Sequence, residues 1–282
     1  VLAAGPLFLP PFYVRVGQLM LYSAGLGLAW AILGGFAGYA SFGHSAFIGV
    51  GAFTAGLVEA QMGSAPAPLL LAAGLVSAAA VCGILSALIA YPILRLRGTF
   101  FAIAMMGVSH VCAEVTNNID FFQGSMGLNY PTIAPKAMDP ANFFYELFLF
   151  ATASIMLISW LIWRSRFGAG LLSIREDEDT ARMLGVPTEH YKRQALVISA
   201  VLTGLLGVLE YLAGTVQQQS LEGGEGDDDV ASIVVAAQAF QLDVPMRGSA
   251  QRLDAFVAAH ASVGRNDSGG SDAPPHFGTL AG

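Results

Sequence analysis

The sequence predicts an all-α fold: a polytopic bundle of about six transmembrane helices, the first of them truncated, with a short cytoplasmic helix. Three observations lead to this prediction. Hydrophobic residues make up 55% of the chain and charged residues only 12%, and the mean hydropathy is +0.61, as is typical of membrane proteins. No Asp, Glu, Lys or Arg lies between Arg15 and Glu59, which leaves room for two spans of bilayer length. A highly charged segment, Arg164–Arg193, lies between two apolar runs.

The expected spans are separated by segments rich in glycine, proline or charge. The first two, Val16–Phe36 and His44–Ala60, flank a Gly-containing connection. The others are Leu69–Ala90, which Pro92 ends, Thr99–Asn118, which the loop Ile119–Ala141 follows, Asn142–Trp163 and Lys192–Thr215. We expect Val1–Phe12 to be the end of an apolar segment whose beginning is missing, and not a signal peptide, because no basic region precedes it.

The distribution of basic residues predicts the orientation of these spans. One side of the membrane receives Arg95, Arg97 and the six Lys or Arg residues of the Arg164–Arg193 segment, and the other side receives Arg15 and Lys136. Because Lys and Arg accumulate in cytoplasmic loops, the charged segment and the Arg95–Arg97 loop are expected on the cytoplasmic side.

The charged segment itself has helical periodicity. Its apolar residues recur at helix-like spacing with charges between them: Phe167, Leu171, Ile174, Met183 and Leu184. Gly185 and Pro187 then end the pattern, so we expect one short amphipathic helix at the membrane surface. A plain positive-inside loop would explain the arginines but not the four consecutive acids Glu176–Asp179. A lipid-binding helix would be mostly basic, so the mixed charge favours a docking surface for a partner.

Two groups of polar residues are candidates for a translocation path. Ser41 and His44 precede a Gly-rich stretch, where the alternatives are tight helix packing and a broken helix start beside the path. For His44, packing and capping come slightly ahead of substrate contact. His110, Glu114 and Asn117 lie on one helical face, which either borders a water-filled route or reaches the outer interface. The sequence favours neither of these two interpretations over the other.

Glu59 and Glu210 also fall near the outer ends of their spans. With Glu114, they would place three glutamates around the outer mouth of the bundle. For Glu59 and Glu210, exposure at the interface is the preferred interpretation.

Three stretches resemble branched-chain amino acid ABC permeases of the LivM type. Residues 38–53, GYASFGHSAFIGVGAF, are similar to that family's G-x-x-S-x-G-H-A-x-F-x-G-x-G-A-Y signature, and residues 94–103, LRLRGTFFAI, to its L-R-L-R-G-x-Y-F-A-I. The segment from Ser165 to Lys192 is similar to its S-R-x-G-R-A-x-x-A-I-R-E-D-E…A…G…Y-K motif. The resemblance covers about residues 15–215.

The resemblance implies a permease subunit of an ATP-binding cassette importer for branched-chain or similar amino acids, in the cell (inner) membrane. Its implied partners are ATPase subunits, a second permease subunit and a periplasmic substrate-binding protein, beside the lipid bilayer and without nucleic acid. The spacing of Asp179, Ala181 and Gly185 is similar to the E-A-A-x-x-x-G pattern of ABC coupling helices. The expected ATPase-coupling helix contains Arg166, Arg175, Glu176, Asp177, Glu178, Ala181 and Gly185.

No enzymatic activity is expected of this chain. Its only lysines are Lys136 and Lys192, neither of which lies in a GxxxxGK[ST] phosphate loop, and no metal-ligand cluster is apparent. ATP would therefore be used by a partner subunit, with no cofactor or metal held here. The main alternative is an ion-coupled secondary transporter or channel, which tends to place acids near the middle of its spans. A membrane-embedded enzyme is a distant third.

The C-terminal part departs from the membrane pattern. We expect residues 1–216 to form an incomplete transmembrane permease domain and residues 217–282 to form an acidic tail of low order, not native to the fold. Its apolar run Val230–Phe240 is too short to span a bilayer. The family's further C-terminal spans have no counterpart after Thr215, as a frameshift or a truncated gene would produce.

Overall fold

The computed structural model describes residues 11–62, 66–118 and 140–222, and these residues form eight α-helices with their connections. The helices are α1 (Pro11–Leu33), α2 (His44–Met62), α3 (Ala67–Ile93), α4 (Thr99–Asn118), α5 (Pro140–Arg164), α6 (Arg166–Glu176), α7 (Glu178–Met183) and α8 (Thr188–Glu222). Six of them, all but the short α6 and α7, are long and apolar enough to cross a membrane. The predicted all-α bundle of about six spans is confirmed for this part of the chain.

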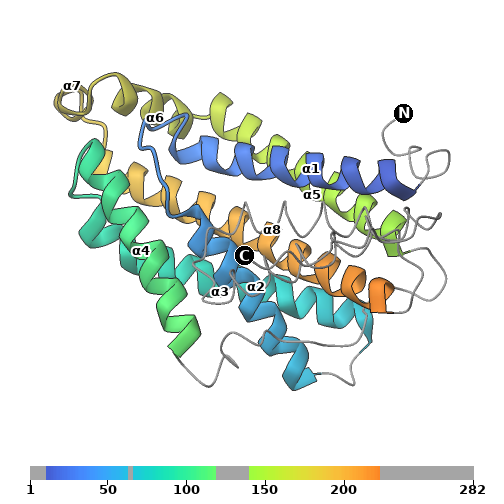
Figure 1. The fold of residues 1–282 in the computed structure, drawn as a ribbon. Coiled ribbons are helices and arrows are strands. Elements are labelled where there is room, and N and C mark those ends of the chain that lie inside the picture. The colour runs from blue at the N-terminus through green and yellow to red at the C-terminus, as the bar shows by residue number, and fades with distance from the viewer. Residues whose placement is uncertain (1–10, 63–65, 119–139, 223–282) are drawn as a thin grey trace, which may run out of the picture. The chain divides into compact units, whose positions relative to one another are not determined.

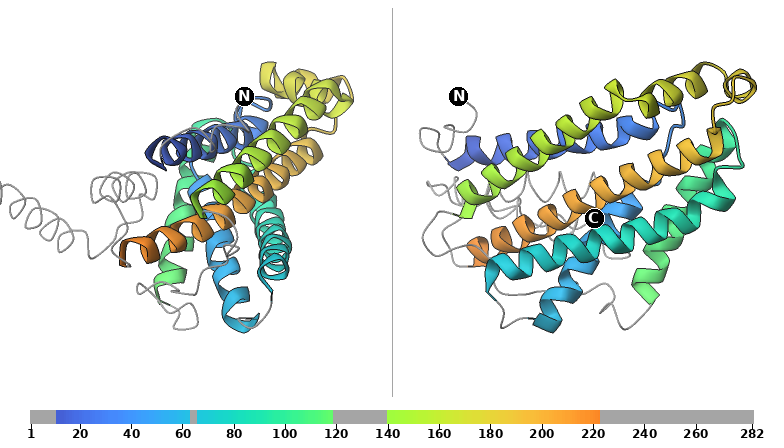
Figure 2. Two further views of the ribbon diagram at one scale, coloured as in Figure 1. Left: turned by 90° about the vertical axis from the view of Figure 1, so that its right-hand side faces the viewer. Right: turned by 180° about the vertical axis from the view of Figure 1, so that it is seen from behind.

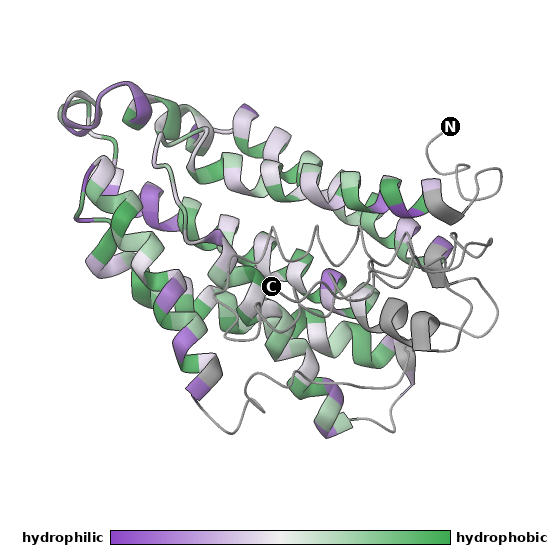
Figure 3. Ribbon diagram, in the orientation of Figure 1, coloured by the Kyte–Doolittle hydropathy of each residue, from purple (hydrophilic) through white to green (hydrophobic). Residues whose placement is uncertain are grey.

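Helix α8 is the centre of the bundle. It packs against α1, α2, α3 and α5, and it lies between the α1–α5 pair and the α2–α3 pair (Figures 1 and 2). Within the chain, 67% of its span is buried, against 11% of the α4 span. Hydrophobic residues cover most of the long helices, whereas polar residues gather around α7 (Figure 3). The apolar surface of the outer helices is suited to lipid or to partner subunits.

Glycines let the backbones of α2 and α8 approach closely. A Cβ atom on Gly51 would lie 2.2 Å from the carbonyl oxygen of Gly204, and one on Gly207 would lie 2.3 Å from that of Ile48. Both distances are far below a van der Waals contact, so only glycine fits at these two positions. Of the two interpretations of the Gly-rich stretch, tight packing therefore holds for Gly51, whereas Gly38, with φ +74°, belongs to the irregular connection before α2.

Several expected boundaries differ from those observed, and three of them concern α3, α8 and α1. Helix α3 continues through Pro92 to Ile93, because a proline in the last turn removes only one hydrogen bond and Leu94 N–H still donates to Ala90 O at 3.1 Å. Helix α8 runs past Thr215 to Glu222, since glutamines are good helix formers. Helix α1 begins at Pro11, inside the expected Val1–Phe12 segment. The remainder of that segment and of the expected tail lie outside the described residues.

The α2–α8 contact can be tested with one added methyl group. We expect Gly51→Ala to destabilise the folded protein by about 1–3 kcal/mol, because the methyl group meets a fixed backbone carbonyl of α8. Gly49→Ala is the matched control, since a Cβ there meets nothing within 4 Å. Thermal unfolding of the detergent-solubilised variants measures the difference. Equal stability of the two variants would contradict the close approach.

Candidate functional site

The charged segment folds as two short helices, not as the single amphipathic helix expected from its periodicity. Asp177 has an extended backbone (φ −157°, ψ 114°) and separates α6 from α7. Its N–H donates to Ser173 O at the end of α6, and its carboxylate accepts from Thr180 N–H at the start of α7. The latter bond is the main reason why the pKa of Asp177 lies below its ordinary value. The break follows from the strong preference of Asp for the N-cap position.

The two helices use their apolar residues differently. On α6, Leu171 and Ile174 are buried and Phe167 packs edge-on against Tyr191 of α8. Beyond the break, Met183 is 87% exposed and Leu184 is 77% exposed. The prediction of one amphipathic helix that carries all five apolar residues is therefore wrong for the last two, because the extended backbone at Asp177 ends the common periodicity.

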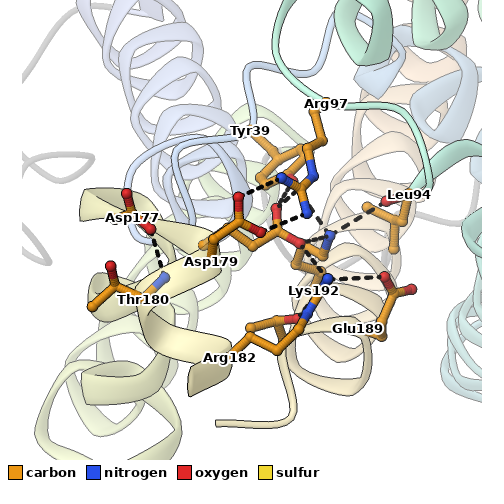
Figure 4. Close-up of polar contacts among 11 residues, drawn as sticks. Tyr39, Leu94, Arg97, Asp177, Asp179, Thr180, Arg182, Glu189 and Lys192 are labelled. Atoms are coloured by element: carbon orange, nitrogen blue, oxygen red, sulfur yellow. Dashed lines mark hydrogen bonds and ion pairs between the residues drawn. The ribbon is translucent and has the colours of Figure 1, made fainter. Parts of the chain in front are cut away.

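Glu178 lies at the centre of a polar cluster that joins α7 to the bundle. Its side chain is 10% exposed; Oε1 lies 2.7 Å from Lys192 Nζ, and Oε2 accepts a 2.5 Å hydrogen bond from the Tyr39 hydroxyl. We call this set the Glu178 cluster: Tyr39, Arg97, Glu178, Asp179, Arg182, Glu189 and Lys192. Figure 4 shows Tyr39, Arg97 and Lys192 converging here from different segments.

Lys192 is the most enclosed charge of the cluster. It is 1% exposed, and its ammonium group also donates to the Tyr39 hydroxyl and to Leu94 O, both at 3.3 Å. Three donors of one ammonium group thus reach three acceptors on three segments: α7, the α1–α2 connection and the end of α3. A buried lysine is tolerated only when its charge is compensated, which Glu178 does here.

The outer members of the cluster are more exposed and contribute less. Arg97 makes two 3.0 Å hydrogen bonds to Asp179 and lies 3.8 Å from Glu178. Arg182 lies 3.2 Å from Glu178 and 3.6 Å from Glu189. Both arginine side chains are 50% exposed, so solvent and salt screen these bridges.

The cluster keeps Glu178 ionised and Tyr39 protonated. Burial alone would raise the pKa of Glu178, but hydrogen bonds from Lys192 and Tyr39, with the charges of Lys192 and Arg97, outweigh it and lower that pKa. Burial, followed by the hydrogen bond to Glu178, raises the pKa of Tyr39. The phenol therefore remains a donor and the carboxylate remains an acceptor.

The residues expected in the coupling helix fall into an exposed and an inward-facing group. Arg166, Glu176 and Gly185 are exposed, and Gly185 has φ +84°, the left-handed conformation that ends a helix. Arg175 is exposed but donates to Gly35 O at 3.0 Å. Ala181 is 1% exposed, so its small side chain serves packing within this chain. Asp177 forms the junction, and Glu178 faces inward.

Sequence reasoning missed Tyr39, Arg97 and Lys192 as partners of Glu178. Two signals were present: a lysine at the start of an apolar span, and an arginine pair in the short loop before α4. Neither identifies a partner, because the pairing depends on how helices distant in sequence pack.

Ser41 and His44 lie inside the protein and are joined to α8. His44 is 6% exposed; its Nε2 lies 2.6 Å from Ser199 Oγ and its Nδ1 lies 3.1 Å from Ser41 Oγ. Ser199 donates its own proton to Ala29 O at 2.7 Å, so its oxygen accepts from His44 Nε2–H. His44 Nδ1 then accepts from the Ser41 hydroxyl. This geometry supports the packing interpretation of His44 and adds Ser199, which the sequence did not single out.

The second candidate group lies on α4. His110 and Glu114 are exposed in this chain, and Asn117 lies one turn further along the same helix. Within the described residues, no hydrogen bond or ion pair joins this group to Ser41 or His44, which are bonded to each other and to Ser199 of α8.

The sequence-based interpretation that Glu59 is exposed at the membrane interface is wrong, because this residue is only 6% exposed. Glu59 follows Gly51 and Ala55 at helical spacing, on the face of α2 that packs against α8 and α3. Glu210 of α8 is half-buried and interacts electrostatically with Arg15 of α1.

Comparison with known proteins identifies the family. A family model described as branched-chain amino acid transport system permease component matches residues 17–237. The high-affinity branched-chain amino acid transport system permease proteins LivM of Salmonella typhimurium and Escherichia coli K12 are each 28% identical to this chain, and each match covers 83% of it. The chain spans 62% of the length of these relatives. No solved structure matches it.

Charge-reversal variants can distinguish the inward-facing acid Glu178 from the exposed acid Glu176 by their effects on stability. Glu178→Lys would place a second cation beside the buried Lys192, so we expect a loss of about 3–5 kcal/mol of stability and poor recovery of folded protein. Glu176→Lys, at an exposed position, should stay within about 0.5 kcal/mol of the wild type. Yield after size-exclusion chromatography and thermal unfolding provide the measurements. A well-folded Glu178→Lys protein would show that the cluster does not hold α7.

The α4 face can be tested by thiol accessibility. In a background without Cys82 and Cys112, we expect cysteines at His110 and Glu114 to react with a water-soluble thiol reagent faster than cysteines at Ala104 and Val108, if this face borders water. The labelling rate in membranes is the readout. Equal rates on both faces would make the stripe purely structural.

Proposed function

Because this chain belongs to the family of branched-chain amino acid transport system permease components, we propose that it is the membrane-spanning subunit of an ATP-binding cassette importer. The chain is a multi-pass membrane protein. The proposed substrates are branched-chain or similar amino acids, and support comes from the printed descriptions of the family and of both relatives. Transport would proceed by alternating access of the bundle to the two sides of the membrane.

One structural observation carries the proposal that a partner ATPase docks on α7. Met183 and Leu184, 87% and 77% exposed, are large apolar residues at the end of a polar projection outside the six spans. Apolar side chains in such a place are suited to a cleft on another protein. The surrounding charges, including Glu176 and Asp179, would form the polar rim of that contact.

The other parts of the assembly follow from this proposal. ATP would be bound and hydrolysed by the docked subunits, and no cofactor would be held by this chain. A second permease subunit and a periplasmic substrate-binding protein would complete the importer, and α6 and α7 would then lie on the cytoplasmic side. An ion-coupled carrier is the second candidate, and the buried carboxyl of Glu59 within α2 is the observation that favours it.

The docking proposal predicts the effect of truncating the apolar pair. We expect the double variant Met183→Ala/Leu184→Ala to bind the partner ATPase at least about tenfold more weakly, because two exposed apolar anchors are lost. Leu96→Ala is the matched control, since Leu96 is an exposed apolar residue of the α3–α4 connection. The dissociation constant of the purified permease for the ATPase is measured by surface-based binding. Unchanged affinity of the double variant would refute docking through α7.

Transport by the reconstituted complex distinguishes the two candidate functions. Uptake of labelled leucine into proteoliposomes should require ATP on the ATPase side and should be competed by other branched-chain amino acids. Uptake that needs an ion gradient and not ATP would support the carrier instead.

A further inference from the structure

Glu178, Lys192 and Tyr39 are the inner part of the Glu178 cluster, and they differ from the outer part in burial. The Lys192 side chain is 1% exposed and that of Glu178 is 10% exposed, whereas the arginines of the outer bridges are 50% exposed. Separating the inner pair would leave an uncompensated charge inside the protein, which is far more costly than breaking a solvated bridge. Helix α7 and the first turns of α8 are therefore held together as one body.

A second connection runs from this pair to the start of α2. Tyr39 lies in the α1–α2 connection, where its hydroxyl contacts both Glu178 and Lys192. Five residues later, His44 at the first position of α2 is bonded to Ser199 of α8. Lys192 and Ser199 are seven residues apart, which places them two turns apart on one face of α8. Residues 39–44 are thus anchored along α8 at two polar points.

Beside the Glu178 cluster, α7 contacts α6, which itself packs against α5 and α8. Ala181 is the one α7 residue that is buried, and its methyl group packs against the bundle without directional bonds. Met183, the last residue of α7, and Leu184, which follows it, are exposed. A displacement applied at that end reaches the spans through α6 and through Glu178, and Glu178 is bonded to both α8 and the α1–α2 connection.

We infer that Tyr39, Glu178 and Lys192 form a buried clasp that transmits displacement of α7 to α8 and to the start of α2. This inference rests on the proposed function, in which a partner ATPase moves α7. The three residues act as positioning residues: they touch neither ATP nor the transported solute, and they couple the docking surface to the helices around Ser41 and His44. Without the clasp, α7 would still dock but would move independently of the spans.

The test compares transport with ATP hydrolysis in the complete reconstituted importer. Tyr39→Phe removes one hydroxyl and leaves the ring packed edge-on against Phe101, so the fold is preserved. Glu178→Gln keeps the shape of the side chain but removes its charge. Glu189→Gln is the matched control, because it removes the charge of an exposed acid in an outer bridge. Assembly, ATPase rate and leucine uptake are measured for each variant.

We expect Tyr39→Phe complexes that assemble and hydrolyse ATP, with uptake per ATP reduced by about fivefold. Glu178→Gln leaves the Lys192 ammonium group uncompensated, so fewer complexes should assemble, and in those that do we expect uptake per ATP to fall by more than about tenfold. The Glu189→Gln complex should keep the wild-type ratio. A wild-type ratio in Tyr39→Phe and Glu178→Gln would overturn the inference, as would losses of uptake that match losses of assembled complex, since the role would then be structural only. Absence of ATP-dependent uptake by the wild-type complex would instead refute the proposed function.

Discussion

The close approach of α2 and α8 is the constraint on which the rest of the structure depends. Where Gly51 meets Gly204 and Gly207 meets Ile48, the two backbones touch, and no side chain separates them. This contact brings His44 to Ser199 and lays residues 39–44 along α8, which in turn brings Tyr39 to Lys192. In a membrane, helices gain little from burying apolar surface against each other, so such backbone contacts and polar bonds determine how they pack.

The sequence alone predicted those helices and turns that are determined by residues close together in the chain. Apolar length identified all six spans, and Thr99–Asn118 was expected with the bounds that α4 has. Local signals also located the end of the helical pattern of the charged segment near Gly185, where the backbone turns left-handed. The prediction that Pro92 ends its span was wrong, because the free-energy cost of a proline depends on its place in the helix. Within the last turn that cost is small.

The candidate site was harder to predict from the sequence, because it depends on which way each side chain faces on its helix. Glu176 and Glu178 are two residues apart in a run of acids, yet one is exposed and the other faces Lys192. Glu59 was expected at the interface, but its place on the glycine-bearing face of α2 buries it. In each case the residue type and position along the chain were known, and the missing information was which neighbouring helix would cover that face.

The order of donors around His44 has a consequence for how three helices can move against one another. Hydrogen bonds run in one direction, from Ser41 to His44, from His44 to Ser199 and from Ser199 to the carbonyl of Ala29. A backbone carbonyl accepts but does not donate, so this series of hydrogen bonds ends at Ala29. The series joins the start of α2 to α8 and α8 to α1, so a shift of α2 along α8 would break the contact between His44 and Ser199.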